Sequence, residues 1–248
     1  MEDIKKVESW IEAIESSNLS KSEQEKRINA LVDLWKFSSC YDGTLELSDV
    51  PGNFIKVDCG ISKLISIHCE PFYIGKQHDI TAEFLSGIEK YFENREEKYA
   101  GLYKIELNKA LPNFNLQTLK DFQKEIIAAI KGEVILYQYV AKLSKFPAER
   151  MLFGNQNFTI LSCGKSLVLD EVEKIETKMA VASNKWLVLM LNNLEDQCDF
   201  YNIENDLSEG FSSDFEKVFI FDFYKAEVVE VILKENIFPV PVGLVQVK

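Results

Sequence analysis

Three short apolar runs between residues 185 and 233 constrain the fold of this chain more than any other feature. Residues 186–191 form the longest unbroken apolar run, and residues 218–221 and 228–233 follow it. Runs this short, rich in β-branched and aromatic residues, are typical of strands buried on both faces. A sheet with two buried faces needs helices on both sides. We therefore predict an α/β fold (α+β is the alternative), with a mixed central sheet, helices on both faces and an N-terminal helical hairpin.

The first 40 residues predict the helical hairpin. Residues 3–16 place apolar side chains three and four residues apart, which is typical of an amphipathic helix. Ser20 and Glu23 form a capping box that starts a second helix, ending near Cys40. The expected inward stripes are Ile4, Val7, Ile11 and Ile14, then Ile28, Leu31, Val32 and Trp35. They could pack on the main domain or on a partner. We expect residues 1–40 to form this hairpin and residues 41–248 a single α/β domain.

The middle of the chain predicts alternating strands and helices. We expect strands over 44–47, 54–57, 61–67, 101–107 and 158–161, and helices over 79–98 and 115–131. Gly132 is expected to end the second of these helices. Residues 134–140 predict a strand, with a continued helix as the alternative. Asp170 is expected to cap a last helix, and the tail beyond Leu233, which holds two prolines, predicts an extended edge.

The cysteines indicate the cellular compartment, and the charge limits the kinds of partner. The net charge is −12, and residues 192–230 hold 11 acidic and 2 basic side chains. Such a chain repels the nucleic-acid backbone. The five cysteines are scattered, with no C-x-x-C pair, and the sequence starts with no apolar signal and holds no run that could cross a bilayer. We therefore predict reduced thiols and a cytoplasmic protein.

The acidic region is the candidate interaction surface. Aromatic side chains lie among its acids, including Phe200, Tyr201, Phe211 and Phe215. Rings can supply buried contact area while charges steer encounter with a basic protein. The alternatives are that Phe200 and Phe215 anchor the region to its own core, and that the acids are a solvated face without a partner. The candidate residues are Glu195, Asp196, Asp199, Glu204, Asp206, Glu209, Asp214 and Glu216.

Three motifs resemble ligand sites but lack a required part. Gly164, Lys165 and Ser166 suit a phosphate loop, but Thr159 stands where its first glycine is needed. Zinc-type residues occur at Cys59, His68, Cys69 and His78, yet adjacent residues of a strand point to opposite faces. Glu204, Asp206, Ser208 and Gly210 are similar to a calcium loop with its glycine one place late. We therefore expect no catalytic residue, metal or cofactor.

One resemblance covers roughly residues 50–233. Pro51, Gly52, Asn53 and Phe54 are followed by residues 64–68, then by 171–179, 186–191 and 218–231. This order resembles uncharacterised bacterial proteins of the restriction-endonuclease-like PD-(D/E)XK superfamily. The family binds a divalent metal through an Asp and a Glu, with a Lys nearby.

At the matching positions this chain has Asn53 and His68. Asp58 and Glu70 are candidate metal ligands at positions shifted from those of the family, with Lys63 between them. The preferred alternative is that these strands have a structural role only, which requires no such shift. The resemblance thus implies the fold and a lost activity.

Three functions follow as hypotheses. The first is a non-catalytic protein that binds another, basic protein, such as an antidote to a toxin or a subunit of a defence system. The alternative is a divergent metal-dependent nuclease. A small-molecule pocket is the third, and nothing in the sequence predicts the oligomeric state.

Overall fold

The computed structural model describes most of the chain between residues 2 and 234. The described residues are 2–48, 53–58, 61–95, 97–108, 118–133, 135–179, 184–191, 200–203, 207, 209–223 and 226–234. The predicted turn at Pro51 and Gly52 and the predicted extended tail lie outside them.

A six-stranded mixed sheet forms the centre of the main body. Its strand order is β1 (Leu45–Leu47), β2 (Asn53–Asp58), β3 (Ile61–Pro71), β8 (Lys185–Leu191), β10 (Lys217–Asp222) and β11 (Glu227–Val231). The first three strands form an antiparallel meander, β3, β8 and β10 run parallel, and β11 returns antiparallel to β10. The apolar run at 186–191 is β8, whose side chains there are all buried. A strand between two parallel neighbours, covered on both faces, needs such a run.

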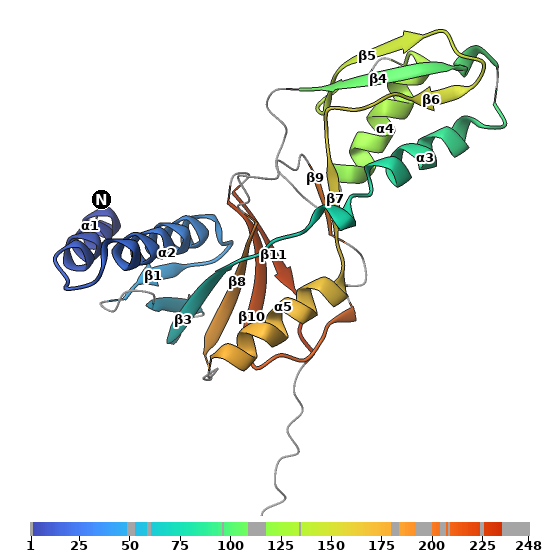
Figure 1. The fold of residues 1–248 in the computed structure, drawn as a ribbon. Helices are drawn as coiled ribbons and strands as arrows, with labels where there is room; N and C mark the ends of the chain where they lie inside the picture. The colour runs from blue at the N-terminus through green and yellow to red at the C-terminus, as the bar shows by residue number, and fades with distance from the viewer. Residues whose placement is uncertain are drawn as a thin grey trace, which may run out of the picture.

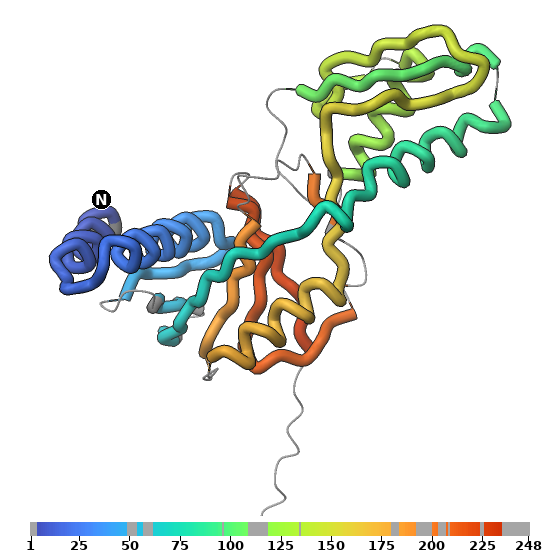
Figure 2. Tube along the Cα trace, viewed as in Figure 1, coloured from blue at the N-terminus to red at the C-terminus, as the bar shows by residue number. Residues whose placement is uncertain are grey.

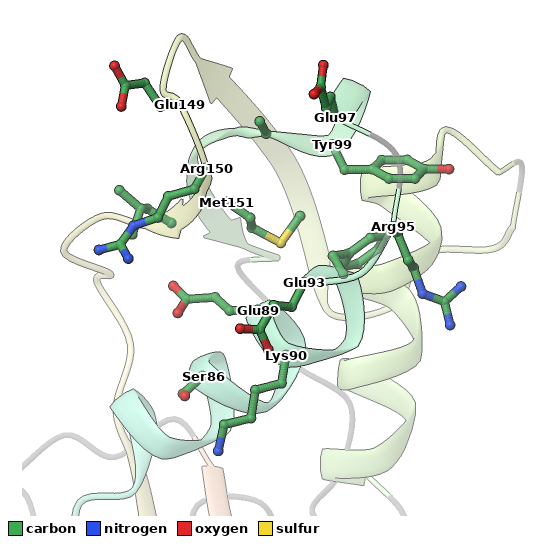
Figure 3. Close-up of a pocket in the computed structure, with 13 residues that line it drawn as sticks. Ser86, Glu89, Lys90, Glu93, Arg95, Glu97, Tyr99, Glu149, Arg150 and Met151 are labelled. Carbon is green, nitrogen blue, oxygen red and sulfur yellow. The ribbon is translucent and has the colours of Figure 1, made fainter.

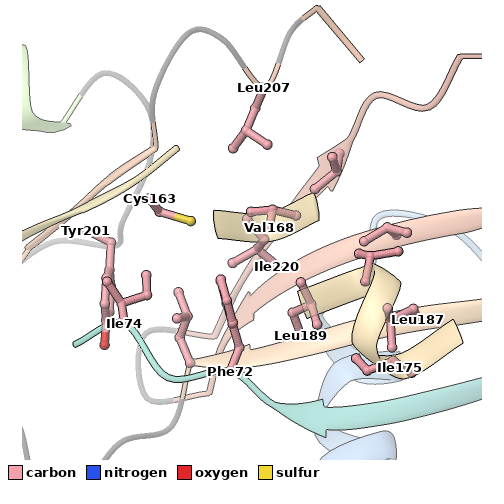
Figure 4. Close-up of a cluster of buried hydrophobic side chains, with 14 of the residues drawn as sticks. Phe72, Ile74, Cys163, Val168, Ile175, Leu187, Leu189, Tyr201, Leu207 and Ile220 are labelled. Carbon is pink, nitrogen blue, oxygen red and sulfur yellow. The ribbon is translucent and has the colours of Figure 1, made fainter. Parts of the chain in front are cut away.

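Helices cover both faces of this sheet, which confirms the predicted α/β class. On one face Trp186, Val188 and Met190 pack with α1 (Glu2–Glu15) and α2 (Lys21–Cys40). On the other, Leu187, Leu189 and Leu191 pack with α5 (Lys165–Lys178). Figure 4 shows part of this second core, where Val168 and Ile175 of α5 lie over Leu187, Leu189 and Ile220.

The N-terminal hairpin packs on the sheet, but with a different stripe from the predicted one. The capping box is confirmed, because Ser20 and Glu23 satisfy each other's backbone N–H groups. The side chains that reach the core are Val7, Trp10, Leu31, Leu34 and Phe37. The prediction was wrong for Ile4, Val32 and Trp35, which are exposed. The sheet selects the stripe through Phe37, whose ring lies 5.3 Å from that of Phe219.

A second lobe is inserted between β3 and α5 (Figures 1 and 2). It contains α3 (Thr81–Phe92), η2 (Glu97–Tyr99), β4 (Gly101–Leu107), α4 (Thr118–Lys131), β5 (Val140–Phe146) and β6 (Met151–Phe153). The sheet order is β5-β4-β6, and α3 and α4 cover one of its faces. The lobe has its own core around Ile88, Ile105, Phe122 and Ile126. The expected division into residues 1–40 and 41–248 stays a prediction, although residues 41–248 contain two lobes.

Two paired strands join the lobes. β7 (Ile160–Cys163) runs parallel to β9 (Phe200–Ile203), and η1 (Lys76–His78) lies beside β7. Their side chains alternate between the two cores: Ile160 and Phe200 belong to the core of the inserted lobe, while Leu161 and Tyr201 belong to that of the main body. The connection is therefore packed on both sides.

Several predicted boundaries were wrong. The helix expected over 79–98 spans only Thr81–Phe92, and the strand expected over 158–161 spans Ile160–Cys163. Residues 135–139 are neither strand nor helix, and the strand begins at Val140, where the buried Glu125 carboxylate accepts backbone N–H groups. The last long helix begins at Lys165 rather than Asp170, with Gly164 as its N-cap. The predicted alternation in β4 and the helix end at Gly132, which has φ +73°, are confirmed. In the described part of the chain, every helix is too short or too polar to cross a membrane.

Candidate functional site

The predicted acidic surface is described for three of its eight residues. Glu209, Asp214 and Glu216 are exposed on the segment that precedes β10. The other five lie outside the described residues: Glu195, Asp196, Asp199, Glu204 and Asp206. The acids of residues 192–230 do not all share this surface, because Asp222 is buried at the end of β10 and Glu230 of β11 pairs with Lys217 of β10. We therefore build the site on residues 209–216.

The aromatic side chains of the region belong to the core, as the alternative predicted. Phe211 and Phe215 pack with Val168, Val172 and Ile175 of α5, and each is at most 4% exposed. Phe200 stacks on Phe122 in the inserted lobe, with ring centroids 4.6 Å apart. The interpretation of these rings as partner contacts was therefore wrong. Their burial instead anchors residues 209–216 against α5.

Polar contacts fasten this segment along α5 at two points. At one end the Lys165 Nζ lies 3.3 Å from the Glu209 carboxylate. At the other, Glu176 accepts hydrogen bonds from the Ser213 hydroxyl at 2.6 Å and from the Asp214 backbone N–H at 2.8 Å. Figure 1 shows the segment running beside the helix.

The helix adds two acids to the same surface. Residues 165, 169, 173 and 176 are spaced by four or three, so they share the side of α5 that faces the segment. Glu173 is exposed on that side, and Asp170, three residues before it, is its exposed neighbour. We call Asp170, Glu173, Glu209, Asp214 and Glu216 the acidic strip. Asp170 was predicted only as a helix cap and Glu173 was missed. Their i, i+3 spacing was the available signal, but only the fold shows that segment 209–216 lies beside them.

Two members of the strip are compensated by the protein's own lysines. Glu209 pairs with Lys165, and Glu216 accepts both contacts of Lys63 at 2.8 Å. Asp170, Glu173 and Asp214 form no side-chain ion pair within the described residues. The charge of Asp170 does, however, help to raise the pKa of Lys174, which pairs with Glu171 on the same helix. Exposed carboxylates on a firmly held surface attract a basic partner at long range, although each contributes little energy in water.

The nuclease-type positions are not brought together as a metal site. Asp58 lies opposite Ile61, at the far end of the β2–β3 hairpin from Glu70. At about 3.3 Å per residue, the nine residues from Ile61 to Glu70 place those two positions roughly 30 Å apart. Asn53 lies opposite Ser66, two residues before His68, and His68 Nε2 is 3.2 Å from Glu70. Lys63 is engaged by Glu216. A metal needs its oxygen ligands within about 2.5 Å, so Asp58 and Glu70 cannot share one.

The described parts of the other sequence motifs do not form a ligand site. Gly164 and Lys165 do follow a strand and open a helix, as the motif requires, but Lys165 pairs with Glu209. Within the described ranges no three His, Cys, Asp or Glu side chains are grouped so as to hold a metal ion. Cys59, Glu204, Asp206 and Ser208 lie outside those ranges.

A cavity of about 410 Å³ opens between α3, η2 and the start of β6 (Figure 3). Glu89 of α3 and Glu93, which follows the end of that helix, face Met151 across it, with Arg150 at one side. The Glu89 carboxylate already accepts the Phe153 backbone N–H at 3.1 Å, and so caps the exposed edge of β6. Because its lining mixes acids and bases and one acid serves the fold, we assign this cavity no ligand.

Comparison with protein-family models, with curated proteins and with solved structures found no match to this chain. The function is therefore argued from the site alone.

Proposed function

We propose that this protein works by binding a basic protein through the acidic strip. The observation that carries the proposal is the group formed by Asp170, Glu173 and Asp214. These carboxylates are exposed, belong to no ion pair in the described residues, and come from two elements fastened together by Glu176. A surface held in one geometry loses less conformational entropy on association than a loose one.

The partner is a protein with a cluster of Lys or Arg on its surface. The net charge of −12 disfavours nucleic acid as the ligand. A cytoplasmic antidote that covers a basic toxin fits this chemistry, and so does a subunit of a defence assembly. In either role the strip steers encounter and sets the orientation, while apolar contacts elsewhere supply most of the affinity.

The test is capture of the partner from cytoplasmic extract, followed by binding kinetics. The variant carries Asp170→Lys, Glu173→Lys and Asp214→Lys, none of which removes a described hydrogen bond of a side chain. A matched control carries Glu8→Lys, Glu12→Lys and Glu15→Lys on α1, which are also exposed and change the net charge equally.

We expect the strip variant to lower the association rate at least tenfold and the control to change it less than threefold. The rate for the wild type should also fall as salt rises past about 0.1 M, where the screening length is roughly 10 Å. Equal effects of the two triple variants would mean that net charge alone acts, and the strip would then not be the binding surface.

The nuclease alternative has the order of elements in its favour and the separation of Asp58 from Glu70 against it. We therefore place it second.

A further inference from the structure

The second helix carries an apolar stripe that the main body leaves uncovered. Ile28, Val32 and Trp35 are four and three residues apart, so they share one side of α2. Val32 is 37% and Trp35 40% exposed, and Ile28 is half-buried. All of α2 is described, and none of the hydrophobic clusters formed by the described residues includes these three side chains. The stripe is therefore available to pack on another surface.

The spacing of the stripe favours a helix as its occupant. The fold itself does not require these side chains, because α2 already covers the sheet with Leu31, Leu34 and Phe37. Apolar residues that recur after four and three positions form the seam between two paired helices. Tryptophan is also enriched in the surfaces that proteins bury on association. A second helix that lies along α2 would cover all three side chains at once.

The charges beside the stripe indicate which helix fits. Glu25 and Lys36 are 11 residues apart, or about three turns, so they lie on the same flank of the stripe. Glu25 is exposed, and the Lys36 Nζ lies 5.9 Å from the centre of the Phe223 ring. Neither side chain forms an ion pair within the described ranges. When two copies of one helix run antiparallel, each flank faces the same flank of the other copy. One acid and one base on a single flank are then complementary to each other.

We propose that α2 is a dimer interface, where it packs antiparallel against α2 of a second copy of this chain. Ile28 and Trp35 are centred between residues 31 and 32, and Glu25 and Lys36 between residues 30 and 31. A two-fold axis near residue 31 therefore packs stripe on stripe and brings Glu25 of each copy to Lys36 of the other. A parallel pairing would place like charges at the same level, so the charges select the antiparallel orientation.

The position of α2 leaves room for the second copy. Figures 1 and 2 show the hairpin at the end of the main body away from the inserted lobe. The hairpin and α5 cover opposite faces of the sheet, so the dimer interface does not use the acidic strip and is independent of the proposed function. With 20 residues, α2 is about 30 Å long. Because a contact of this length is small for a protein interface, we expect a dissociation constant in the micromolar range.

Sedimentation equilibrium of the full chain, from about 1 to 200 µM, tests the proposal. We expect the mean mass to rise with concentration from 28.5 kDa toward twice that value. Val32→Ala with Trp35→Ala should raise the dissociation constant at least tenfold, because both side chains lose buried contact area. The matched control is Leu136→Ala with Phe146→Ala in the inserted lobe, at side chains that are 82% and 50% exposed. It should change the dissociation constant less than twofold.

Charge reversal tests the orientation of the two helices. Glu25→Lys or Lys36→Glu alone turns both ion pairs between the copies into like-charge pairs, and each should raise the dissociation constant at least fivefold. The two reversals combined restore opposite charges and should return the dissociation constant to within about twofold of the wild type. Glu25→Lys also makes the net charge less negative, so it would strengthen self-association if net charge alone acted.

Three outcomes overturn the proposal. The first is a protein that stays monomeric over the whole concentration range. The second is a dimer that the double alanine variant of α2 weakens no more than the control does. The third is a single charge reversal that does not weaken the dimer, or a combination that does not restore it. Circular dichroism checks that each variant folds, and if the double alanine variant does not, Trp35→Ala alone replaces it.

Discussion

The Ser213 hydroxyl donates a 2.6 Å hydrogen bond to the Glu176 carboxylate, and this contact fixes residues 209–216 along α5. The same carboxylate oxygen accepts the Asp214 backbone N–H, and the Ser213 oxygen in turn accepts the N–H of Phe215. The geometry of the acidic strip therefore depends on a buried serine and one glutamate that is not itself part of the strip.

Replacing Glu176 by alanine should lower the free energy of unfolding by about 1–3 kcal/mol, because the Ser213 hydroxyl and the Asp214 N–H lose their acceptor. Urea unfolding measures the change. The matched control is Glu173→Ala on the same helix, which removes an exposed carboxylate without a described contact and should cost less than about 0.5 kcal/mol. Equal losses in both variants would show that the contact does not hold the segment.

Much of the main sheet could be predicted from the sequence because its strands lack polar faces. Residues 186–191 have no alternation to misread, and their burial on both sides required helices on both faces. The stripe of α2 could not be predicted in the same way. Its apolar residues at 28, 31, 32, 34, 35 and 37 form two overlapping stripes, and only the aromatic contacts with Phe219 and Phe221 select the one through Phe37.

The inserted lobe and the acidic strip could not be predicted from the sequence, for a different reason. β6 has only three residues, and the Gln156 side chain continues its pairing by accepting the Ile105 N–H at 2.9 Å. No periodicity signals such a contact. The strip joins Glu173 to Asp214 across about 40 residues of chain, so a search for acids in one linear region found three of its five members. The sequence also left open whether the aromatic side chains face a partner or the core.

The protein should not cleave DNA or RNA with Mg²⁺ or Mn²⁺. The positions of Asp58 and Glu70 are roughly 30 Å apart along the hairpin, so a divalent ion bound by one carboxylate would lack the other. Supercoiled plasmid and single-stranded RNA are suitable substrates, with a metal-chelated reaction as the control. Metal-dependent cleavage that disappears in Glu70→Ala, but persists in Glu46→Ala, would establish an active site on β3 and contradict the proposed function.

Cys69 should react slowly in the folded protein. Burial raises the pKa of its thiol, and the negative charge of Asp33 raises it further. The reactive thiolate is therefore scarce at pH 8, whereas an unfolded thiol, with a pKa of about 8.5, is partly ionised there. Alkylation of Cys69, followed by mass spectrometry, should be at least about 100-fold slower in the native protein than in urea.

The pH dependence of alkylation shows whether the pKa of Cys69 is raised. In the native protein the logarithm of the alkylation rate at Cys69 should still rise with pH above pH 9, where the rate for the unfolded chain levels off. Asp33→Asn should speed the native reaction by less than tenfold, because burial is the larger cause of the raised pKa. A native rate that levels off near pH 8.5 would mean that the thiol has an ordinary pKa.

Glu125 should be the most sensitive polar residue of the inserted lobe. It is 5% exposed, and its carboxylate accepts the backbone N–H groups of Gln138, Tyr139 and Val140 at 2.6, 2.9 and 3.1 Å. These bonds hold the backbone of residues 138–140 at the start of β5. Glu125→Gln keeps the shape but turns an NH₂ group toward one or two of these donors. We expect a loss of about 2–3 kcal/mol in the free energy of unfolding.

The measurement is urea unfolding combined with hydrogen exchange at individual amides. In Glu125→Gln the amides of Tyr139 and Val140 should exchange at least tenfold faster, while those of β8 in the main body change less, because the two lobes have separate cores. The matched control is Asp121→Asn, one turn earlier on α4, whose exposed pair with Lys124 should contribute less than about 0.5 kcal/mol. If Glu125→Gln and Asp121→Asn are equally stable and the two amides remain protected, the carboxylate does not position β5, and the packing of Tyr139 against Phe122 must do so instead.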